Sequence, residues 1–584
     1  MKLIRRLAQC VREYKKASIL TPIFVSFEVF IEVLMPLIIV YFGQAIRNSD
    51  QRMMIVWGVV LLVLAPMSLT FGVLSGKQCA VASCGFAKNL RKDLYASVQN
   101  FSFSNIDKFS TSSLVTRLTT DVSNVQMAYM MIIRIAVRCP LMMISAVVMA
   151  FIISWQLALI FVVLVPILGF ALYLIIRKAM PLFDRVFKKY DNLNNSVQEN
   201  VRAMRVVKAY VREDYETEKF NKAAEEVCAD FTKAEKIVAL NNPIVSFAMY
   251  MSMILIAFLG SKLIISCGGT WINSESLSSM LTYSMQVLMS LVMVSMIFVM
   301  VTISATSAKR IYEVLEEKSD IVNPENPVMS VKDGSIDFNG VSFKYSKTAE
   351  KFALENIDLH IRSGETIGVI GGTGSSKSTL VNLITRLYDV SVGEVLVGGV
   401  NVKRYDLESL RNAVAVVLQK NVLFSGTIAE NLRWGNRNAT QEQLEEACRL
   451  AQADEFIRSF PDGYDTYIEQ GGTNVSGGQK QRLCIARALL KQPKVLILDD
   501  STSAVDTKTD ALIRQGMKKY IPETTKIIIA QRISSVQDAD KIIVMDQGTI
   551  NGIGTHEELL KNNAIYREVY DIQNRISAQG GEQA

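Results

Sequence analysis

Cysteine and histidine are scarce in this sequence, and neither is spaced for metal binding or cross-linking. Its 584 residues include eight cysteines without a CxxC pair and two histidines, His360 and His556. Only Cys267 falls in a segment expected outside the membrane. The sequence therefore predicts neither a disulfide framework nor a zinc site.

A basic stripe interleaved with aromatic residues is also lacking. The net charge is +7, but lysine and arginine cluster beside apolar runs, as topology signals of membrane proteins do. The sequence thus predicts a lipid bilayer as partner and no nucleic acid.

Long apolar runs are abundant in the first half of the chain. Half of all residues are hydrophobic and the mean hydropathy is +0.23, too high for an ordinary soluble protein. Six runs are long enough to cross a bilayer as helices. These predicted spans are residues 19–41, 54–76, 128–154, 156–177, 243–266 and 278–302.

The distribution of charge predicts the orientation of the spans. Cations are dense in 1–17, 77–127 and 178–242, whereas 268–282 has none. By the positive-inside rule, both termini and the long loops are cytoplasmic. The expected outer ends carry an interfacial belt made of Trp57, Trp155 and Trp271.

The two long cytoplasmic stretches are polar and poor in glycine and proline, so we expect membrane helices to continue into the cytosol as hairpins whose tips touch the soluble domain. The expected organisation is an amphipathic lead-in at 1–17, a transmembrane domain at 18–307, a linker at 308–330, a nucleotide-binding domain at 331–576 and a polar tail at 577–584.

A phosphate-binding loop lies in 366-TIGVIGGTGSSKSTLVNLI-384, where an apolar strand, a glycine-rich turn and a helix follow one another. In such a loop the backbone amides hold phosphates, Lys377 reaches the β and γ phosphates and Ser378 ligates Mg²⁺. Ser376 replaces the last glycine of the pattern. The predicted cofactors are ATP and Mg²⁺, bound through Gly372, Thr373, Gly374, Ser375, Ser376, Lys377, Ser378 and Thr379.

Residues 475-VSGGQKQRLCIARALLKQPKVLILDD-500 resemble the ATP-binding cassette (ABC) proteins, whose signature normally begins with leucine where Val475 stands. Tyr345, Gln419 and 503-SAVD-506 extend the resemblance over the soluble domain. With six spans ahead of one cassette, the chain resembles an ABC exporter half-transporter of a bacterial inner (plasma) membrane. The fold class implied is a polytopic α-helical membrane domain fused to an α/β P-loop nucleotide-binding domain.

The resemblance assigns roles to matching residues. Tyr345 stacks on adenine, Gln419 links the nucleotide to the membrane helices, and Asp499 holds Mg²⁺ through water. Two cassettes close head to tail, so that each signature contacts the ATP of the other chain. The implied metal set is Ser378, Gln419 and Asp499, and the implied signature contacts are Ser476, Gly477, Gly478 and Gln479.

Two positions depart from the family pattern at its catalytic site. Asp500 stands where the family has a glutamate that polarises the attacking water, and it is shorter by one methylene. Gln531 stands at the switch histidine, and an amide cannot become an imidazolium. Harmless drift in an active ATPase is one interpretation. We favour a degenerate ATP site.

This interpretation predicts the degenerate-site subunit of a heterodimeric multidrug exporter. Its partner is a second ABC half-transporter with the catalytic glutamate and switch histidine intact, and the complex is an ATP-hydrolysing translocase of hydrophobic or amphipathic compounds. The alternative is a lipid or peptide exporter. A remoter alternative is a non-transporting, ATP-switched membrane regulator.

Charges and methionines inside the spans are the substrate candidates. Glu28 and Glu32 lie one turn apart, as do Arg134 and Arg138, and Glu28 and Arg138 are expected at similar depth. They form an inter-helix ion pair, or a freed glutamate attracts cationic drugs, or they are exposed at the interface. The last predicted span places methionines on one face, as a packing stripe or as a binding wall: Met285, Met289, Met293, Met296 and Met300.

Overall fold

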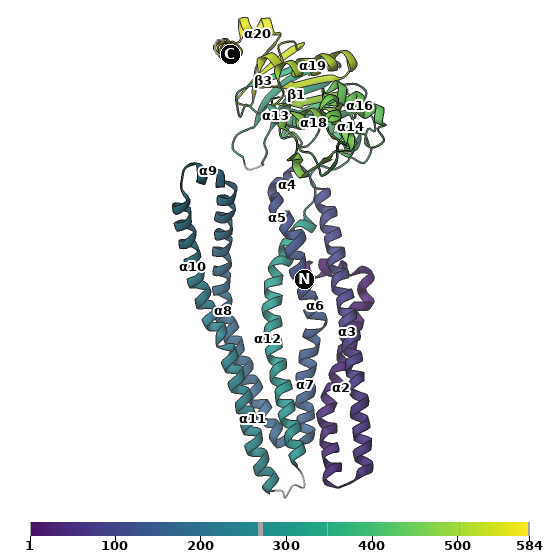
Figure 1. Cartoon of the computed structure of the whole chain (residues 1–584), viewed down its shortest axis with the longest axis vertical. Helices are drawn as coiled ribbons and strands as arrows, with labels where there is room; N and C mark the ends of the chain where they lie inside the picture. Colours follow the sequence, from purple (N-terminus) through teal and green to yellow (C-terminus); the bar gives the residue numbers. More distant parts are fainter. Residues whose placement is uncertain (1, 267–271, 347–348, 502, 582–584) are drawn as a thin grey trace. The chain divides into compact units, whose positions relative to one another are not determined.

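The computed structural model describes residues 2–266, 272–346, 349–501 and 503–581 (Figure 1). The chain forms two compact units. The first contains Met1–Asn100 and Phe109–Glu317, and the second contains Phe101–Lys108 and Lys318–Ala584. Each unit is described by itself below.

The first unit is helical. Among the described residues, six continuous helical runs are long and apolar enough to cross a membrane. Five of the predicted spans lie wholly within one run each, and the span at 128–154 extends one residue beyond Thr111–Ile153. The prediction of six spans is therefore confirmed. The helices are α1 (Lys2–Gln9), α2 (Lys15–Arg47), α3 (Gln51–Gln99), α5 (Thr111–Thr116), α6 (Val122–Ile133), α7 (Ile135–Ile153), α8 (Trp155–Arg202), α9 (Met204–Ala209), α10 (Glu213–Ala239), α11 (Asn241–Ser266) and α12 (Ser274–Glu316).

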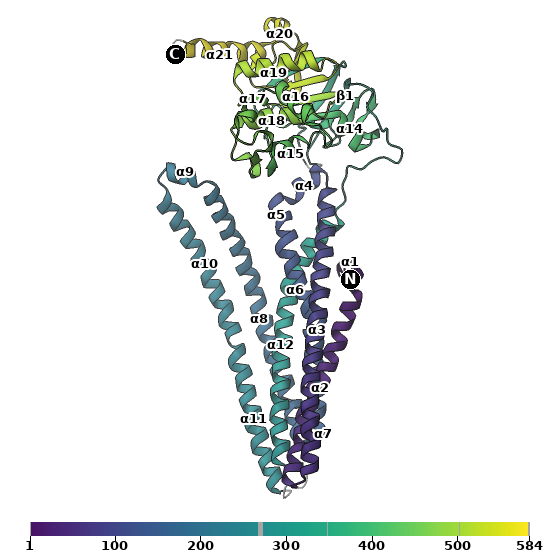
Figure 2. The same ribbon diagram turned by 45° about the vertical axis from the view of Figure 1, so that its right-hand side comes forward.

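Several helices are much longer than the apolar runs that they contain. Helix α3 has 49 residues and α8 has 48, which is beyond the roughly 20 needed to span a bilayer. Helices α8 and α10 run side by side and are joined through the short α9 (Figures 1 and 2). This arrangement matches the expectation that membrane helices continue as polar hairpins.

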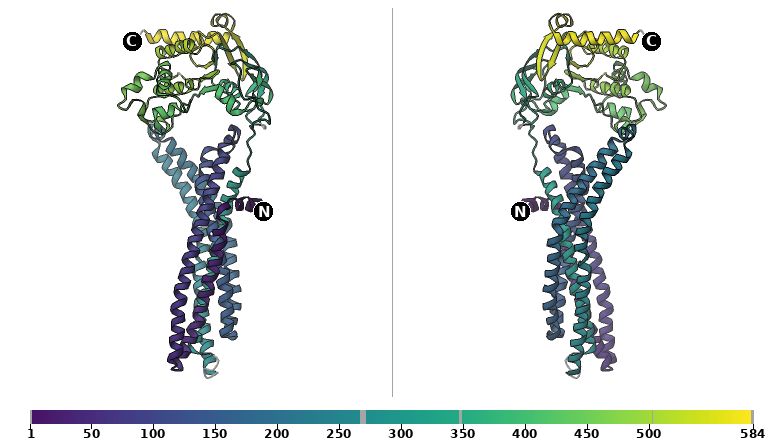
Figure 3. Two further views of the ribbon diagram at one scale, coloured as in Figure 1. Left: turned by 90° about the vertical axis from the view of Figure 1, so that its right-hand side faces the viewer. Right: turned by 90° about the vertical axis from the view of Figure 1, so that its left-hand side faces the viewer.

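Helices α2, α7 and α12 share an apolar core within the first unit. Val25, Val29 and Val33 of α2 are buried against Tyr283 and Val287 of α12, together with Met142 and Ala146 of α7. Helix α3 packs along α2, and the two are drawn in purple and blue in Figure 3. The packing of this core fixes the positions of the charged residues on α2 and α7.

The third apolar run is interrupted for one residue at Arg134, between α6 and α7. Arg134 has φ −114° and ψ −64°, a distorted right-handed helical conformation, and its N–H still donates to the carbonyl of Met130. Pro140 lies in the second turn of α7 and has no N–H to donate to the carbonyl four residues earlier, a common cause of helix bending. The predicted span at 128–154 nevertheless lies, apart from its last residue, in one membrane-length helical run, Thr111–Ile153, and the distortion at Arg134 within this run was not predicted.

The second unit is an α/β domain built on a six-stranded sheet in the order β12-β11-β3-β10-β9-β6, in which only β12 is antiparallel. A four-stranded antiparallel sheet in the order β2-β1-β4-β5 accompanies it. The strands are β1 (Ile336–Phe343), β2 (Leu354–Ile361), β3 (Thr366–Gly371), β4 (Val392–Val397), β5 (Val400–Asn401), β6 (Val414–Val417), β7 (Gly426–Thr427), β8 (Tyr467–Ile468), β9 (Val495–Asp499), β10 (Thr525–Ile529), β11 (Lys541–Asp546) and β12 (Thr549–Gly554).

Strands β9 and β10 are buried along their whole length, as expected for central parallel strands covered on both faces. The helices of this unit are α4 (Phe103–Phe109), α13 (Lys377–Ile384), α14 (Leu407–Ala413), α15 (Ile428–Leu432), α16 (Gln441–Leu450), α17 (Asp454–Ser459), α18 (Gly477–Leu489), α19 (Thr507–Tyr520), α20 (His556–Asn562) and α21 (Ala564–Gly581).

The domain boundaries differ from those expected in three places. Residues 101–108, expected inside the transmembrane domain, belong to the second unit. The first unit continues to Glu317 and so includes the first part of the expected linker, as the end of α12. Helix α21 continues to Gly581 and takes up most of the expected polar tail, whose last residues lie outside the described part.

Candidate nucleotide site and membrane cavity

Three parallel strands end at the same edge of the large sheet. Ile529 of β10 pairs with Val369 of β3 on one side and with Asp499 of β9 on the other. The loops that follow these strands carry the phosphate-binding residues, Asp500 and Gln531. The carboxyl edge of such a sheet is where α/β proteins bind ligands.

The phosphate-binding loop is an open cradle between β3 and α13. A Cβ added to Gly372 or Gly374 would meet nothing within 4 Å. The Lys377 ammonium lies over the loop and donates to the carbonyl oxygens of Gly371 and Gly372 at 2.9 and 2.8 Å. Burial lowers the pKa of this lysine, while Asp499 and Asp500 oppose the shift. The loop therefore offers space, backbone amides and a cation for phosphates.

Ser376 adopts the backbone conformation for which glycine is normally used. Its φ is 68° and its ψ is 27°, the left-handed region. Such a residue costs on the order of 1–3 kcal/mol. The loop therefore keeps its left-handed backbone conformation with serine in place of glycine, at a cost in backbone strain. The Ser376 hydroxyl makes no capping hydrogen bond to α13.

The residues expected to hold Mg²⁺ come together at the end of β9. The Ser378 hydroxyl is hydrogen-bonded to the Asp499 carboxylate, whose pKa is raised chiefly by burial and further by Asp500. Gln419 also reaches this region, since its amide nitrogen contacts Asp500 at 3.4 Å. A hydroxyl, a carboxylate and an amide oxygen are ligands that Mg²⁺ accepts, so the chemistry of this set fits the ion.

Asp500 is held by the two amides nearest to it. Its Oδ2 accepts hydrogen bonds from Nε2 of Gln531 at 3.0 Å and from Nε2 of Gln419 at 3.4 Å. Its backbone N–H donates to the carbonyl of Ile529, and its φ is 48°. The short carboxylate thus lies within a small network rather than extending from the loop.

Tyr345 lies beside the phosphate loop. Its hydroxyl is 2.8 Å from that of Thr379, and its ring meets the rings of Phe343 and Tyr388 edge-on. About half of Tyr345 is exposed, which leaves a ring face available for stacking.

The signature serine begins a helix. Ser476 is the N-cap of α18 and forms a capping box with Gln479, in which each side chain bonds the other's backbone N–H. A Cβ at Gly478 would lie 2.9 Å from the carbonyl oxygen of Ala504, so only glycine fits there without a shift. The described hydrogen bonds of Ser476 stay within α18, and none joins it to the chain's own phosphate loop.

Three residues that position this site are not among those predicted from the sequence. Gln573 of α21 donates to the carbonyl of Gln531 at 2.8 Å and accepts from the N–H of Ile533. Gln481 of α18 accepts from the N–H of Ala504 and contacts Ser503. Tyr388 donates to Asp107 of α4 at 2.9 Å. Gln481 stands inside a recognised motif, whereas no local signal marks the other two.

The charges predicted within the membrane region form an unequal cluster. Arg138 donates to Glu28 through Nη1 and to both carboxylate oxygens of Glu32 through Nη2, at 2.8 and 2.9 Å. This is the geometry of the inter-helix ion pair. Arg134 has no ion-pair partner among the described residues.

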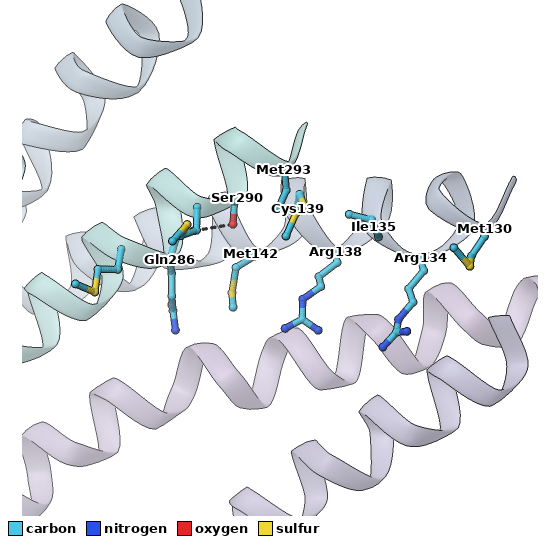
Figure 4. A pocket seen from close by; sticks show the side chains of 11 residues that line it. Met130, Arg134, Ile135, Arg138, Cys139, Met142, Gln286, Ser290 and Met293 are labelled. Carbon is cyan, nitrogen blue, oxygen red and sulfur yellow. Dashed lines mark hydrogen bonds between the residues drawn. The ribbon is translucent and has the colours of Figure 1, made fainter. Parts of the chain in front are cut away.

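A cavity of about 570 Å³ lies beside this cluster (Figure 4). Arg134, Arg138 and Met142 line one side of it, and the methionine face of α12 lines the other with Met285, Met289 and Met293. Met296 is exposed on the same helix beyond the cavity. Trp57 stacks with Tyr41 and Trp155 is exposed, whereas Trp271 and Cys267 lie outside the described residues.

Known protein families and proteins match both units of this chain. The family model described as "ABC transporter transmembrane region" matches residues 19–292, and the family model described as "ABC transporter" matches residues 354–503. An uncharacterized ABC transporter ATP-binding protein of Bacillus subtilis, YfiB, is 36% identical over 94% of both chains. The chain is an ABC transporter. A second B. subtilis protein of this kind, YknU, is 32% identical over 98% of both chains.

The ABC transporter has an exporter fold, with the membrane region fused to the ATP-binding domain. A bacterial Atm1-family ABC exporter solved with ATP bound superposes with a TM-score of 0.80, covering 96% of this chain and 98% of that one at 22% identity. An ATP-dependent lipid A-core flippase of Syntrophus aciditrophicus is 30% identical over 85% of this chain and 81% of its own. The transporter is thus a multi-pass membrane protein with a cassette of the type that uses ATP and Mg²⁺.

Proposed function

We propose that this ABC transporter is the degenerate-site subunit of a heterodimeric exporter. The observation that carries the proposal is the network around Asp500, which ties a shortened carboxylate to Gln531 at the position of the switch histidine. A catalytic base has to come within about 2.6–3.2 Å of the water it acts on. A carboxylate drawn back by roughly 1.5 Å, the length of one C–C bond, and held by two amides is poorly placed for that task.

This chain retains the signature motif that a partner's ATP site would require. Ser476 lies exposed at the N-terminus of α18, with its capping box formed and with Gly477 and Gly478 following it. Anions are stabilised at such an end. The chain therefore binds ATP at its own loop with slow turnover, and its signature completes the working site of a partner that has the glutamate and the histidine.

The proposed cargo is a hydrophobic or amphipathic compound that reaches the cavity from the membrane. Flexible, polarizable methionines adapt to varied apolar shapes, which suits a multidrug exporter. The second candidate is lipid export, and the similarity to a protein described as a lipid A-core flippase favours it over peptide export. Both candidates place the chain in a bacterial inner membrane with cytoplasmic termini, as the positive-inside rule indicates.

The test compares two single variants in the assembled pair. Ser476→Ala removes the cap and the phosphate contact of the partner's site, so we expect the ATPase rate to fall by about 100-fold or more, the scale of one transition-state contact. Asp500→Asn acts only on the degenerate site and should lower the rate less than about tenfold, below the usual loss of a general base.

Near-normal turnover of Ser476→Ala would contradict the shared-site assignment. A loss of about 100-fold in Asp500→Asn would mean that Asp500 is a working base. A pair that exports nothing and hydrolyses nothing, yet changes conformation with ATP, would favour the regulator alternative.

A further inference from the structure

The wall of the membrane cavity contains arginines, whereas the glutamates that lie near the cavity are not part of its wall. Among the described residues that line it, Arg134 and Arg138 are the charged ones, while Glu28 and Glu32 are not part of its wall. Figure 4 shows both arginine side chains extending in the same direction from successive turns at the α6–α7 junction. The charged part of the described cavity wall is therefore cationic.

The two arginines differ in what holds them. Arg138 is neutralised by two carboxylates from α2, which occupy both of its terminal nitrogens. Arg134 has no carboxylate within ion-pair distance among the described residues, and its Nη1 lies 3.5 Å from the point where a Cβ on Gly76 of α3 would be. A charge inside a membrane region is costly unless it is paired or functional.

Glycines of α3 make room for the cluster. Gly72 and Gly76 lie one turn apart, and a Cβ at Gly72 would come within 3.1 Å of Glu28 Oε1. The glutamate is thus held against α3, where it is buried, and its Oε2 lies away from solvent without a hydrogen-bond partner in the described part of the chain. It is not free to meet a cationic cargo in the cavity.

The rest of the cavity wall suits an apolar chain with a polar headgroup. Met285, Met289 and Met293 supply an adaptable apolar face. Gln286, between them, adds one polar side chain to this face. A guanidinium is the side chain best matched to phosphate or carboxylate oxygens.

We propose that this cavity selects amphiphiles with an anionic headgroup, with Arg134 as the residue that binds the anion. The inference rests on the proposed export function and narrows the class of its cargo. Arg134 binds the headgroup, and the α12 methionines contact the apolar chain. Arg138 remains paired with Glu28 and Glu32. The alternative in which a freed glutamate attracts cationic drugs is therefore disfavoured.

The test uses the exporter purified with its partner in phosphatidylcholine nanodiscs. Two photoreactive probes share a 12-carbon alkyl chain with a diazirine and differ only in the headgroup, phosphate or trimethylammonium. Labelling of the peptide that carries Met285, Met289 and Met293 is measured against probe concentration. Competition by phosphatidic acid and by unlabelled dodecyl phosphate then separates a bilayer lipid from a small amphiphile as the preferred source of the anion.

We expect the phosphate probe to saturate this peptide at lower concentration than the ammonium probe. Arg134→Gln should raise the half-saturation concentration for the phosphate probe by about 10- to 100-fold, the loss expected for a hydrogen bond to a charged group. Arg134→Lys should raise it less. Arg47→Gln is the matched control and should leave it unchanged, because Arg47 is exposed at the end of α2 and does not line the cavity.

Preferential labelling by the ammonium probe would overturn the inference, as would equal effects of Arg134→Gln and Arg47→Gln. The comparison of the two probes on the unaltered protein stands even if Arg134→Gln fails to assemble. ATP hydrolysis by the same preparation separates the two proposals: a pair that hydrolyses ATP but prefers the cation leaves export standing, whereas a pair without ATPase activity contradicts the proposed function itself.

Discussion

The network of Asp500 and Gln531 predicts that restoring one residue alone leaves the site slow. Asp500→Glu extends the carboxylate by roughly 1.5 Å, but Gln531, which donates to Asp500 at 3.0 Å, still cannot carry a positive charge. Because the two residues are in direct contact, their effects are coupled, by about 0.5–3 kcal/mol for such pairs. The double change to Glu and His should therefore exceed the product of the single effects.

The assay is single-turnover ATP hydrolysis by the assembled pair, with the other site silenced by changing the partner's catalytic glutamate to glutamine. Each single variant should gain less than about tenfold, and Asp500→Glu with Gln531→His should gain about 10²- to 10⁴-fold, the range of general acid–base catalysis. Asp538→Glu, the same change at an exposed carboxylate, is the control. Full activity from Asp500→Glu alone, or none from the double variant, would refute the reasoning.

Two further predictions concern packing. Tyr388→Phe removes the hydroxyl that donates to Asp107, an interaction worth about 0.5–1.5 kcal/mol, and should speed proteolysis of 101–108 about two- to tenfold. The control Tyr467→Phe, at an exposed tyrosine, should leave the proteolysis rate unchanged, and equal rates for the two variants would contradict the contact. Gly85→Val places a Cβ within about 2.5 Å of the Tyr14 ring and should lower stability by about 1–3 kcal/mol in a detergent thermal-inactivation assay. The control Gly169→Val, with nothing within 4 Å of an added Cβ, should be as stable as wild type. Equal losses of stability in the two variants would show that the Tyr14 contact is not the cause.

Much of the fold could be predicted because its signals are local. The six spans follow from apolar runs whose length matches a bilayer, and the phosphate loop follows from glycines and a lysine at fixed spacing between a strand and a helix. The helix distortion at Arg134 was not predicted, because Pro140 lies six residues away and proline is tolerated inside many membrane helices.

The contacts that join distant parts of the chain were harder to predict. The similar depth of Glu28 and Arg138 indicated a possible ion pair, but which arginine would take both carboxylates depends on how α2, α3 and α7 pack. The glycines at 72 and 76 that shape this packing are unremarkable in a membrane helix. In the same way, the bond from Gln573 to the carbonyl of Gln531 crosses 42 positions in the sequence, and no spacing rule predicts it.

The central claim is that the working ATP site is shared with a different subunit. Its most direct test is to tag this chain in its native membrane, extract it gently and identify by mass spectrometry what accompanies it in stoichiometric amount. The account predicts a second ABC half-transporter with glutamate and histidine at the positions occupied here by Asp500 and Gln531. Recovery of this chain alone, as a homodimer that hydrolyses ATP briskly, would contradict it.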